Sequence, residues 1–183
     1  MEVSDKPVIF TVGHSTRTAE ELIRVLRAYD IELLIDVRRF PGSRRLPQFG
    51  SAELKRSLEA ANIDMLWLPS LGGRRRPAPD SPNTGWRVDG FRGYADHTET
   101  PEFADGMFEL TTLASGKTTA IMCAEILWWQ CHRRLISDVL VYLGWPVIHI
   151  RDEQSSSKHV IAEPARIVNG TLTWAADTQL EFL

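Results

Sequence analysis

Both cysteines of this 183-residue chain lie in one short segment that also carries a glutamate, a histidine and an arginine. Five residues separate Cys123 and Glu125 from Cys131, His132 and Arg133. Thiolates serve as nucleophiles, redox groups or metal ligands, and carboxylate and imidazole groups transfer protons. A guanidinium group binds anions. This segment is therefore the first candidate for a functional site.

Three roles stay open for the two thiols. At the start of a helix, Cys131 would have a depressed pKa and could act as a nucleophile. As a redox pair, Cys123 and Cys131 could form a disulfide if their Cα atoms lie within about 7 Å. As metal ligands, the thiolates could complete a tetrahedral set with His132, His14 or Glu125, although their spacing is not a common zinc spacing, so no metal ligand is assigned. A structural cysteine buried at a strand end is the alternative.

The candidate proton-transferring groups differ in position along the chain. Glu125 follows an apolar segment, where it would serve as a general base or pair with Arg133, and pairing is slightly favoured. His132 follows Cys131 directly, and adjacent side chains on a helix diverge by about 100°. A Cys–His dyad with His132 is therefore not favoured, and His14, at the end of another apolar segment, is the preferred base.

Candidate substrate-binding residues follow two further apolar segments. Ser15 lies directly after His14, and Asp36 and Arg38 end the apolar run 31–37. Two residues apart, Asp36 and Arg38 would share one face of a strand. They would form either a salt bridge or a ligand-binding pair, with the acid on a ribose or base edge and the arginine on a phosphate.

Positive charge is concentrated in one part of the chain. Residues 38 to 92 contain ten arginines and one lysine against five acidic residues, whereas the whole chain has a net charge of -3. Arg44 and Arg74 belong to arginine clusters in two loops expected beside the site. Because arginine binds phosphate in a bidentate way, these loops predict an anionic ligand, which could be a nucleotide, a phosphorylated metabolite or a nucleic-acid strand. Solvated loop charge is the alternative.

Strands and helices are predicted to alternate along the chain. A capping box at Thr18 and caps at Ser51 and Thr100 mark three helix starts. Residues 71–93 are predicted to form an irregular loop, and Asn169-Gly170 predicts a hairpin over 167–174. The remaining segments are strands over 8–12, 31–37, 65–68, 118–122 and 145–150, and a helix over 131–143.

This alternation predicts one α/β domain over residues 1–183, with 151–183 as a C-terminal extension. The expected architecture is a three-layer sandwich, in which a mostly parallel five-stranded sheet carries helices on both faces and a C-terminal β-hairpin follows. Right-handed crossovers place the ends of the first, second and fourth strands at one edge, where open α/β sheets bind ligands. That edge would gather Gly13-His14-Ser15, Asp36, Arg38, Cys123 and Glu125.

Composition and missing motifs exclude several classes. There is no apolar run of about 18–20 residues and no secretory signal, so a cytoplasmic location without membrane association is expected. Neither G-x-G-x-x-G nor a Walker A motif occurs, and Cys123 does not begin a C-x5-R loop because position 129 is tryptophan. No nucleotide cofactor is therefore indicated. The Trp128-Trp129 pair would pack inside, stack on bases or form a homodimer contact. His149 and His159 are expected to be structural.

In combination, these motifs resemble the domain-of-unknown-function 488 family. The resemblance implies a small α/β domain and no particular reaction. One departure is the loop 126–130, which is usually polar with a proline in the family and here reads Ile-Leu-Trp-Trp-Gln. The matching residues are Thr11 to Ser15, Asp36 to Arg38 with Pro41 and Ser43, Leu71 to Gly73, Phe91 with Tyr94, Met122 to Glu125, Cys131 to Arg133, His149-Ile150, His159, and Ala165 to Gly170.

Three hypotheses for function follow. The first is a thiol-dependent hydrolase, transferase or redox enzyme acting on an anionic substrate. The second is a non-enzymatic module that binds nucleic acid through its arginine loops, and the third is a metal-binding regulatory protein with ligands at Cys123 and Cys131. The enzyme would use Cys131 or Cys123 as the reactive thiol, His14 or Glu125 for proton transfer, and Arg38 and Arg133 for the anion.

Overall fold

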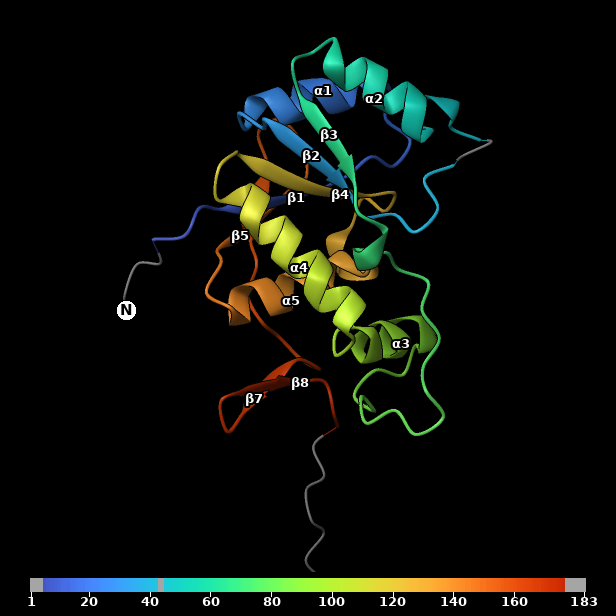
Figure 1. The fold of residues 1–183 in the computed structure, drawn as a ribbon, viewed down its shortest axis with the longest axis vertical. Coiled ribbons are helices and arrows are strands. Elements are labelled where there is room, and N and C mark those ends of the chain that lie inside the picture. The colour runs from blue at the N-terminus through green and yellow to red at the C-terminus, as the bar shows by residue number, and fades with distance from the viewer. Residues whose placement is uncertain (1–4, 43–44, 177–183) are drawn as a thin grey trace, which may run out of the picture.

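A six-stranded sheet forms the centre of the computed structural model, which describes residues 5–42 and 45–176. The strand order is β3-β2-β4-β1-β5-β6 (Figure 1). Neighbours among the first five strands pair in parallel, and β6 pairs antiparallel with β5. The strands are β1 (Ile9–Gly13), β2 (Leu33–Asp36), β3 (Asp64–Trp67), β4 (Thr119–Cys123), β5 (Val147–Ile150) and β6 (Ser156–Lys158).

The α/β sandwich predicted from the alternation is confirmed. In Figure 1, α1 (Ala19–Ala28) and α2 (Ser51–Glu59) lie on one side of the sheet, and α4 (Pro101–Ala114) and α5 (Arg133–Tyr142) lie on the other. The prediction missed β6, because its three residues, Ser-Ser-Lys, are all exposed and show no apolar alternation.

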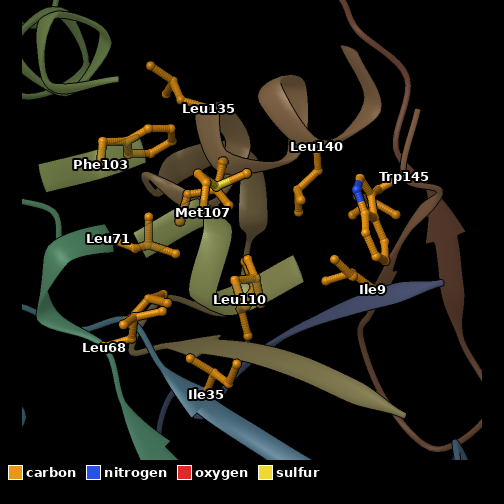
Figure 2. Packing of buried hydrophobic residues seen from close by; sticks show 14 of the residues in the cluster. Ile9, Ile35, Leu68, Leu71, Phe103, Met107, Leu110, Leu135, Leu140 and Trp145 are labelled. Atoms are coloured by element: carbon orange, nitrogen blue, oxygen red, sulfur yellow. The ribbon is translucent and has the colours of Figure 1, made fainter. Parts of the chain in front are cut away.

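Two apolar clusters hold these layers together, one on each face of the sheet. Adjacent strand residues point to opposite faces, so Leu34 packs in the cluster with α1 and α2 while Ile35 packs in the cluster with α4 and α5. Figure 2 shows Met107 and Leu110 of α4 packed above Ile35. Burial on both faces explains why the central strands are apolar throughout.

Local hydrogen bonding explains where the helices begin. At α1 both bonds of the Thr18–Glu21 capping box form, and Thr100 Oγ1 accepts the Phe103 N–H at 3.2 Å at the start of α4, as predicted. The predicted cap at Ser51 is wrong. Gly50 is the N-cap of α2 and supplies no side-chain hydrogen bond, so Ser51 lies inside the first turn.

The predicted loop over residues 71–93 is also partly wrong, because α3 (Asp89–His97) begins inside it. Glycine has a low helix propensity, so Gly90 and Gly93 argue against a helix when only the sequence is considered. A Cβ at Gly93 would collide with the backbone of Arg76 and Pro77, so the glycine lets that segment cross the helix closely.

The C-terminal residues pack against the same core. Strands β7 (Arg166–Val168) and β8 (Thr171–Thr173) form the predicted hairpin, with Asn169 and Gly170 both at positive φ, as a two-residue type I′ turn requires. Trp174 then enters the α4 and α5 cluster. Within the described residues, no helix combines the length and the apolar content that a membrane span requires.

Candidate active site at the strand ends

Strands β2, β4 and β1 are neighbours, so their carboxyl ends meet at one edge of the sheet as expected. A cavity of about 320 Å³ opens beside this edge. Its lining joins the end of β4 to the loops that follow β2 and η2 (Pro69–Leu71) and to the start of α3. The lining residues that carry chemistry are Cys123, Glu125, Cys131, His132, Arg38, Arg39 and Arg74.

One imidazole contacts both sulfurs. His132 Nδ1 lies 3.6 Å from Cys131 Sγ and 3.9 Å from Cys123 Sγ. On its other side, His132 Nε2 lies 3.0 Å from the carbonyl oxygen of Val37. A carbonyl only accepts, so Nε2 carries a hydrogen, and Nδ1 faces the sulfurs, where it accepts from a thiol or, once protonated, donates to a thiolate.

The expectation that His132 would diverge from Cys131 is wrong. It assumed a helix from residue 131, whereas Cys131 is extended (φ -140°, ψ 155°) and follows the short 3-10 helix η3 (Trp128–Gln130). His132 is the N-cap of α5, which begins only at Arg133. The turn between an extended residue and a helix N-cap brings the two side chains together.

Arg133 holds Cys131 from the other side. Its backbone N–H and its Nε donate to Cys131 Sγ at 3.5 and 3.4 Å, and its Nη2 donates to the carbonyl oxygen of Glu125. The side chain is almost completely buried, at 1% exposure. Arg133 therefore positions the thiol and the 123–131 loop, and it is not part of the cavity lining.

The surroundings shift the pKa values of the two thiols in opposite directions. Burial opposes ionisation of Cys131, but the hydrogen bond from Cys123 and the nearby His132 and Arg133 outweigh burial and lower the pKa of Cys131 well below that of a free thiol. The hydrogen bond to Cys131 and burial raise the pKa of Cys123 well above the ordinary value. The surroundings therefore favour Cys131 as the sulfur that ionises first, with Cys123 as its hydrogen-bond donor.

His14 belongs to a neighbouring cluster that does not line the cavity. Its Nε2 accepts from Arg38 Nη1 at 3.2 Å, its Nδ1 donates to the Ser15 carbonyl at 2.9 Å, and its ring stacks on Phe49. Burial and the positive charge of Arg38 lower the pKa of His14 to about 4. Both ring nitrogens are in use, and the structure brings His132, not His14, to the sulfurs.

Asp36 and Arg38 form the buried salt bridge that was one of the two predicted alternatives. Arg38 Nη2 and Nε donate to the Asp36 carboxylate at 2.6 and 2.8 Å, and Nη2 also donates to the Phe49 carbonyl. Arg38 reaches the cavity wall at 7% exposure, whereas Asp36 is fully buried. The pair fixes the loop after β2 and leaves no free oxygen of Asp36 in the cavity lining.

The slightly favoured ion pair between Glu125 and Arg133 is wrong. Arg133 contacts the backbone carbonyl of Glu125, and the Glu125 side chain is exposed in the cavity wall. Among the described residues, its carboxylate has no ion-pair partner. A Cβ at Gly13 would collide with that same Glu125 carbonyl, which explains the glycine at the end of β1.

The cluster could also hold a metal ion. The two sulfurs and the His132 imidazole present one donor atom each, and these atoms all lie within 4.8 Å of one another. Two thiolates and an imidazole suit Zn²⁺, and the Val37 carbonyl on the opposite ring nitrogen is the usual second partner of a metal-bound histidine.

Comparison with protein families was made over the whole chain. The model of the family described as domain of unknown function DUF488 matches residues 18–140. The chain belongs to this family. No curated protein and no solved structure matches it. Within the DUF488 match lie Asp36 to Arg38, the glycines at 72 and 73, and the whole cysteine motif.

Several cavity residues in this DUF488 chain were not assigned from the sequence. Arg39 and Phe40 directly follow Arg38, and Gly73 lies against His132, where a Cβ would sit 2.7 Å from Nδ1. The sequence signal that could have identified Arg39 as a site residue was its position next to the end of a strand. Arg74 lines the cavity as expected of a substrate-binding residue, Ser15 does not, and Arg44 lies outside the described residues.

His149 and His159, which were expected to be structural, belong to a buried hydrogen-bonded chain. The Asp138 carboxylate accepts from His159 Nε2 at 2.9 Å and from Trp174 Nε1 at 3.3 Å. His159 Nδ1 lies 2.9 Å from His149 Nε2, and the Thr11 hydroxyl lies 2.7 Å from His149 Nδ1. Trp128 stacks on His149, with ring centroids 4.0 Å apart, so this half-buried tryptophan packs against the protein while Trp129 is exposed.

Proposed function

We propose that this protein is a thiol-dependent enzyme, a hydrolase or transferase, that uses Cys131 as its nucleophile on an anionic substrate in the cavity. The observation that carries the proposal is the set of contacts on one sulfur. Cys131 Sγ meets the Arg133 backbone N–H, the Arg133 guanidinium and the His132 imidazole within 3.6 Å. These groups stabilise a thiolate at the wall of a cavity.

Each residue of the site has its own step in the proposed reaction. The Cys131 sulfur attacks an electrophilic carbon of the substrate and forms a sulfur–carbon bond, and the leaving group departs with the bonding electrons. His132 Nδ1 takes the proton that Cys131 gives up and delivers it to the leaving group. Water or another acceptor then attacks the adduct and returns a proton to His132, which frees the sulfur. Glu125, in the same wall, is the second candidate for proton transfer.

The anion preference comes from the arginines of the cavity. Arg39 and Arg74 are exposed in its lining, and Glu125 is the acidic residue that faces them. Arg38 and Arg133 were expected to hold the anion, but their guanidinium groups are buried and bonded within the protein. We therefore assign substrate binding to Arg39 and Arg74, and we place the protein in a reducing cytoplasm, where the thiols persist.

Paired alkylating agents test this proposal. The chelator-treated protein is reacted with iodoacetate or with its neutral analogue iodoacetamide, and each cysteine is followed by peptide mass spectrometry. We expect Cys131 to react first, and to react faster with iodoacetate, because the cavity arginines attract the anion.

The control is Arg39→Ala combined with Arg74→Ala, which should reverse the order of the two reagents at Cys131 without abolishing alkylation by iodoacetamide. Preferential reaction of Cys123, or an equal preference for the neutral reagent in both proteins, would overturn the proposal.

A further inference from the structure

A second cavity lies next to the thiol cavity. It measures about 540 Å³ and shares Arg39 and Arg74 with the lining of the first. Arg75 and Arg76 extend that lining, and Asp96 is the acidic residue in it. The two neighbouring cavities are here together called the arginine groove, and the thiols lie in the first of them.

The backbone that carries these arginines is held firmly. Arg75 Nε donates to the Gly72 carbonyl at 3.0 Å, and its guanidinium pairs with Glu102, also at 3.0 Å. The backbone N–H of Ala78 donates to Asp96 at 2.8 Å, and Gly93 lets the segment lie directly on α3. A fixed backbone lowers the entropy that binding costs.

The arginines on either side of Arg75 in the sequence direct their charge toward solvent. Arg74 and Arg76 are exposed, and Arg39 Nη1 donates to the Arg74 carbonyl at 3.1 Å, which joins the loop after β2 to the arginine segment. Asp96 already accepts hydrogen bonds from Ala78, Ser81 and Asn83. Within the part of the chain that the structure describes, Arg39, Arg74 and Arg76 form no ion pair, so they present three positive charges along the groove.

The thiol end of the groove has apolar walls. Phe40 and Val88 are exposed there, at 64% and 59%, and Phe91 lines the same cavity. Exposed apolar side chains of this size indicate a contact surface. Flat aromatic and apolar walls suit a nucleobase, and arginines at successive places along a groove suit the phosphates of a strand.

We infer that the substrate of the thiol site is a single-stranded nucleic acid. One base enters the cavity between Phe40 and Val88, and the adjoining phosphates bind Arg39, Arg74 and Arg76. The identity of the strand as a substrate rests on the proposed function, whereas its binding to the groove does not. An acidic peptide would satisfy the arginines but would leave the apolar walls without a planar partner, and a duplex would have to unstack a base before it could enter.

Fluorescence anisotropy with a labelled single-stranded DNA of about 12 nucleotides tests the inference. We expect binding that weakens steeply with salt. The double variant Arg74→Ala and Arg76→Ala should bind at least about tenfold more weakly, and the slope of log affinity against log salt should become shallower by about 1.4. Phe40→Ala should weaken binding about fivefold or more without changing that slope.

The matched control is Arg24→Ala with Arg56→Ala, which removes two exposed arginines on α1 and α2, and circular dichroism checks that all variants fold. The inference is overturned if the control loses as much affinity as the groove variant, or if adenosine monophosphate competes as well as the oligonucleotide. It is also overturned if tripolyphosphate competes equally and Phe40→Ala has no effect, since the ligand is then a phosphate chain. Loss of oligonucleotide binding alongside anion-selective alkylation of Cys131 would leave the proposed function standing.

Discussion

Cys131 and Cys123 are chemically identical and almost equally buried, yet their surroundings give them different roles. Arg133 donates twice to Cys131, whereas Cys123 contacts His132, Cys131 and the Glu125 backbone and receives no hydrogen bond from Arg133 among the described contacts. A shared imidazole and an asymmetric arginine decide which sulfur ionises. At this scale, the His132 ring is the group that contacts both sulfurs, so the ionisation of Cys131 depends on where that ring lies.

Gly73→Ala tests that dependence. A Cβ at position 73 would lie 2.7 Å from His132 Nδ1, so the ring must turn away from the sulfurs. We expect the pKa of Cys131 to rise toward the ordinary value of about 8.5, and stability to fall by only about 1–2 kcal/mol. The pH dependence of alkylation and urea unfolding measure these two effects.

Gly90→Ala is the matched control, because Gly90 lines the same cavity but a Cβ there meets no atom within 4 Å. It should leave the reactivity of Cys131 unchanged. If Gly73→Ala also leaves it unchanged, His132 does not support the thiolate.

The residue types of the site could be predicted from the sequence, but most of their pairings could not. Asp36 and Arg38 form the salt bridge, which was one of the two predicted alternatives. This pairing could be predicted because residues two apart at a strand end share a face. His132 was set aside because the helix was assumed to begin at Cys131, and Glu125 was paired with Arg133 on charge alone. A helix boundary shifted by two residues and a preference of Arg133 for a backbone carbonyl account for both errors.

At the scale of elements, one buried hydrogen-bonded chain ties the loop between the cysteines to the rest of the fold. Asp138 of α5, His149 of β5, His159 after β6 and Trp174 after β8 meet in it, and Trp128 of η3 stacks on the ring of His149. The Trp128-Trp129 loop, which departs from the family pattern, is therefore anchored to the fold by the contact between Trp128 and His149.

Asp138→Asn should destabilise the protein by about 2–4 kcal/mol, measured by urea unfolding. The carboxylate accepts from two donors, and an asparagine would turn its own N–H groups toward one of them. Asp105→Asn, at an exposed position of α4, is the control and should change stability by less than about 0.5 kcal/mol. If Asp138→Asn loses no more stability than Asp105→Asn, the Asp138 carboxylate does not hold the buried hydrogen-bonded chain together.

Elements with strong periodicity were predicted well and irregular ones were not. The five parallel strands, the Thr18 and Thr100 caps and the Asn-Gly hairpin follow from local patterns. Helix α3 was missed because glycine opposes helix formation, and at Gly93 the reason for the glycine is a close crossing by the Arg76–Pro77 backbone. Contacts between segments distant in sequence, such as His149 with His159 and Asp138, leave no local pattern.

At the scale of the whole molecule, the strand order brings the site together. Because β2, β4 and β1 are neighbours, three separate sequence motifs end at one edge, which right-handed crossovers predicted. The net charge of -3 gives no sign of the arginine groove, since its positive charge lies in the two loops that line the cavities. Local charge, and not total charge, is what a substrate meets there.

The most direct test of the account is the alkylation rate of each cysteine against pH, with iodoacetamide, on native chelator-treated protein. We predict that Cys131 reacts at a pH well below the value of a free thiol, about 8.5, while Cys123 reacts only at a pH well above it. The Arg133 and His132 contacts then stabilise the Cys131 thiolate. If both cysteines instead titrate together near the value of a free thiol, about 8.5, or if Cys123 titrates first, the assignment of Cys131 as the nucleophile is contradicted.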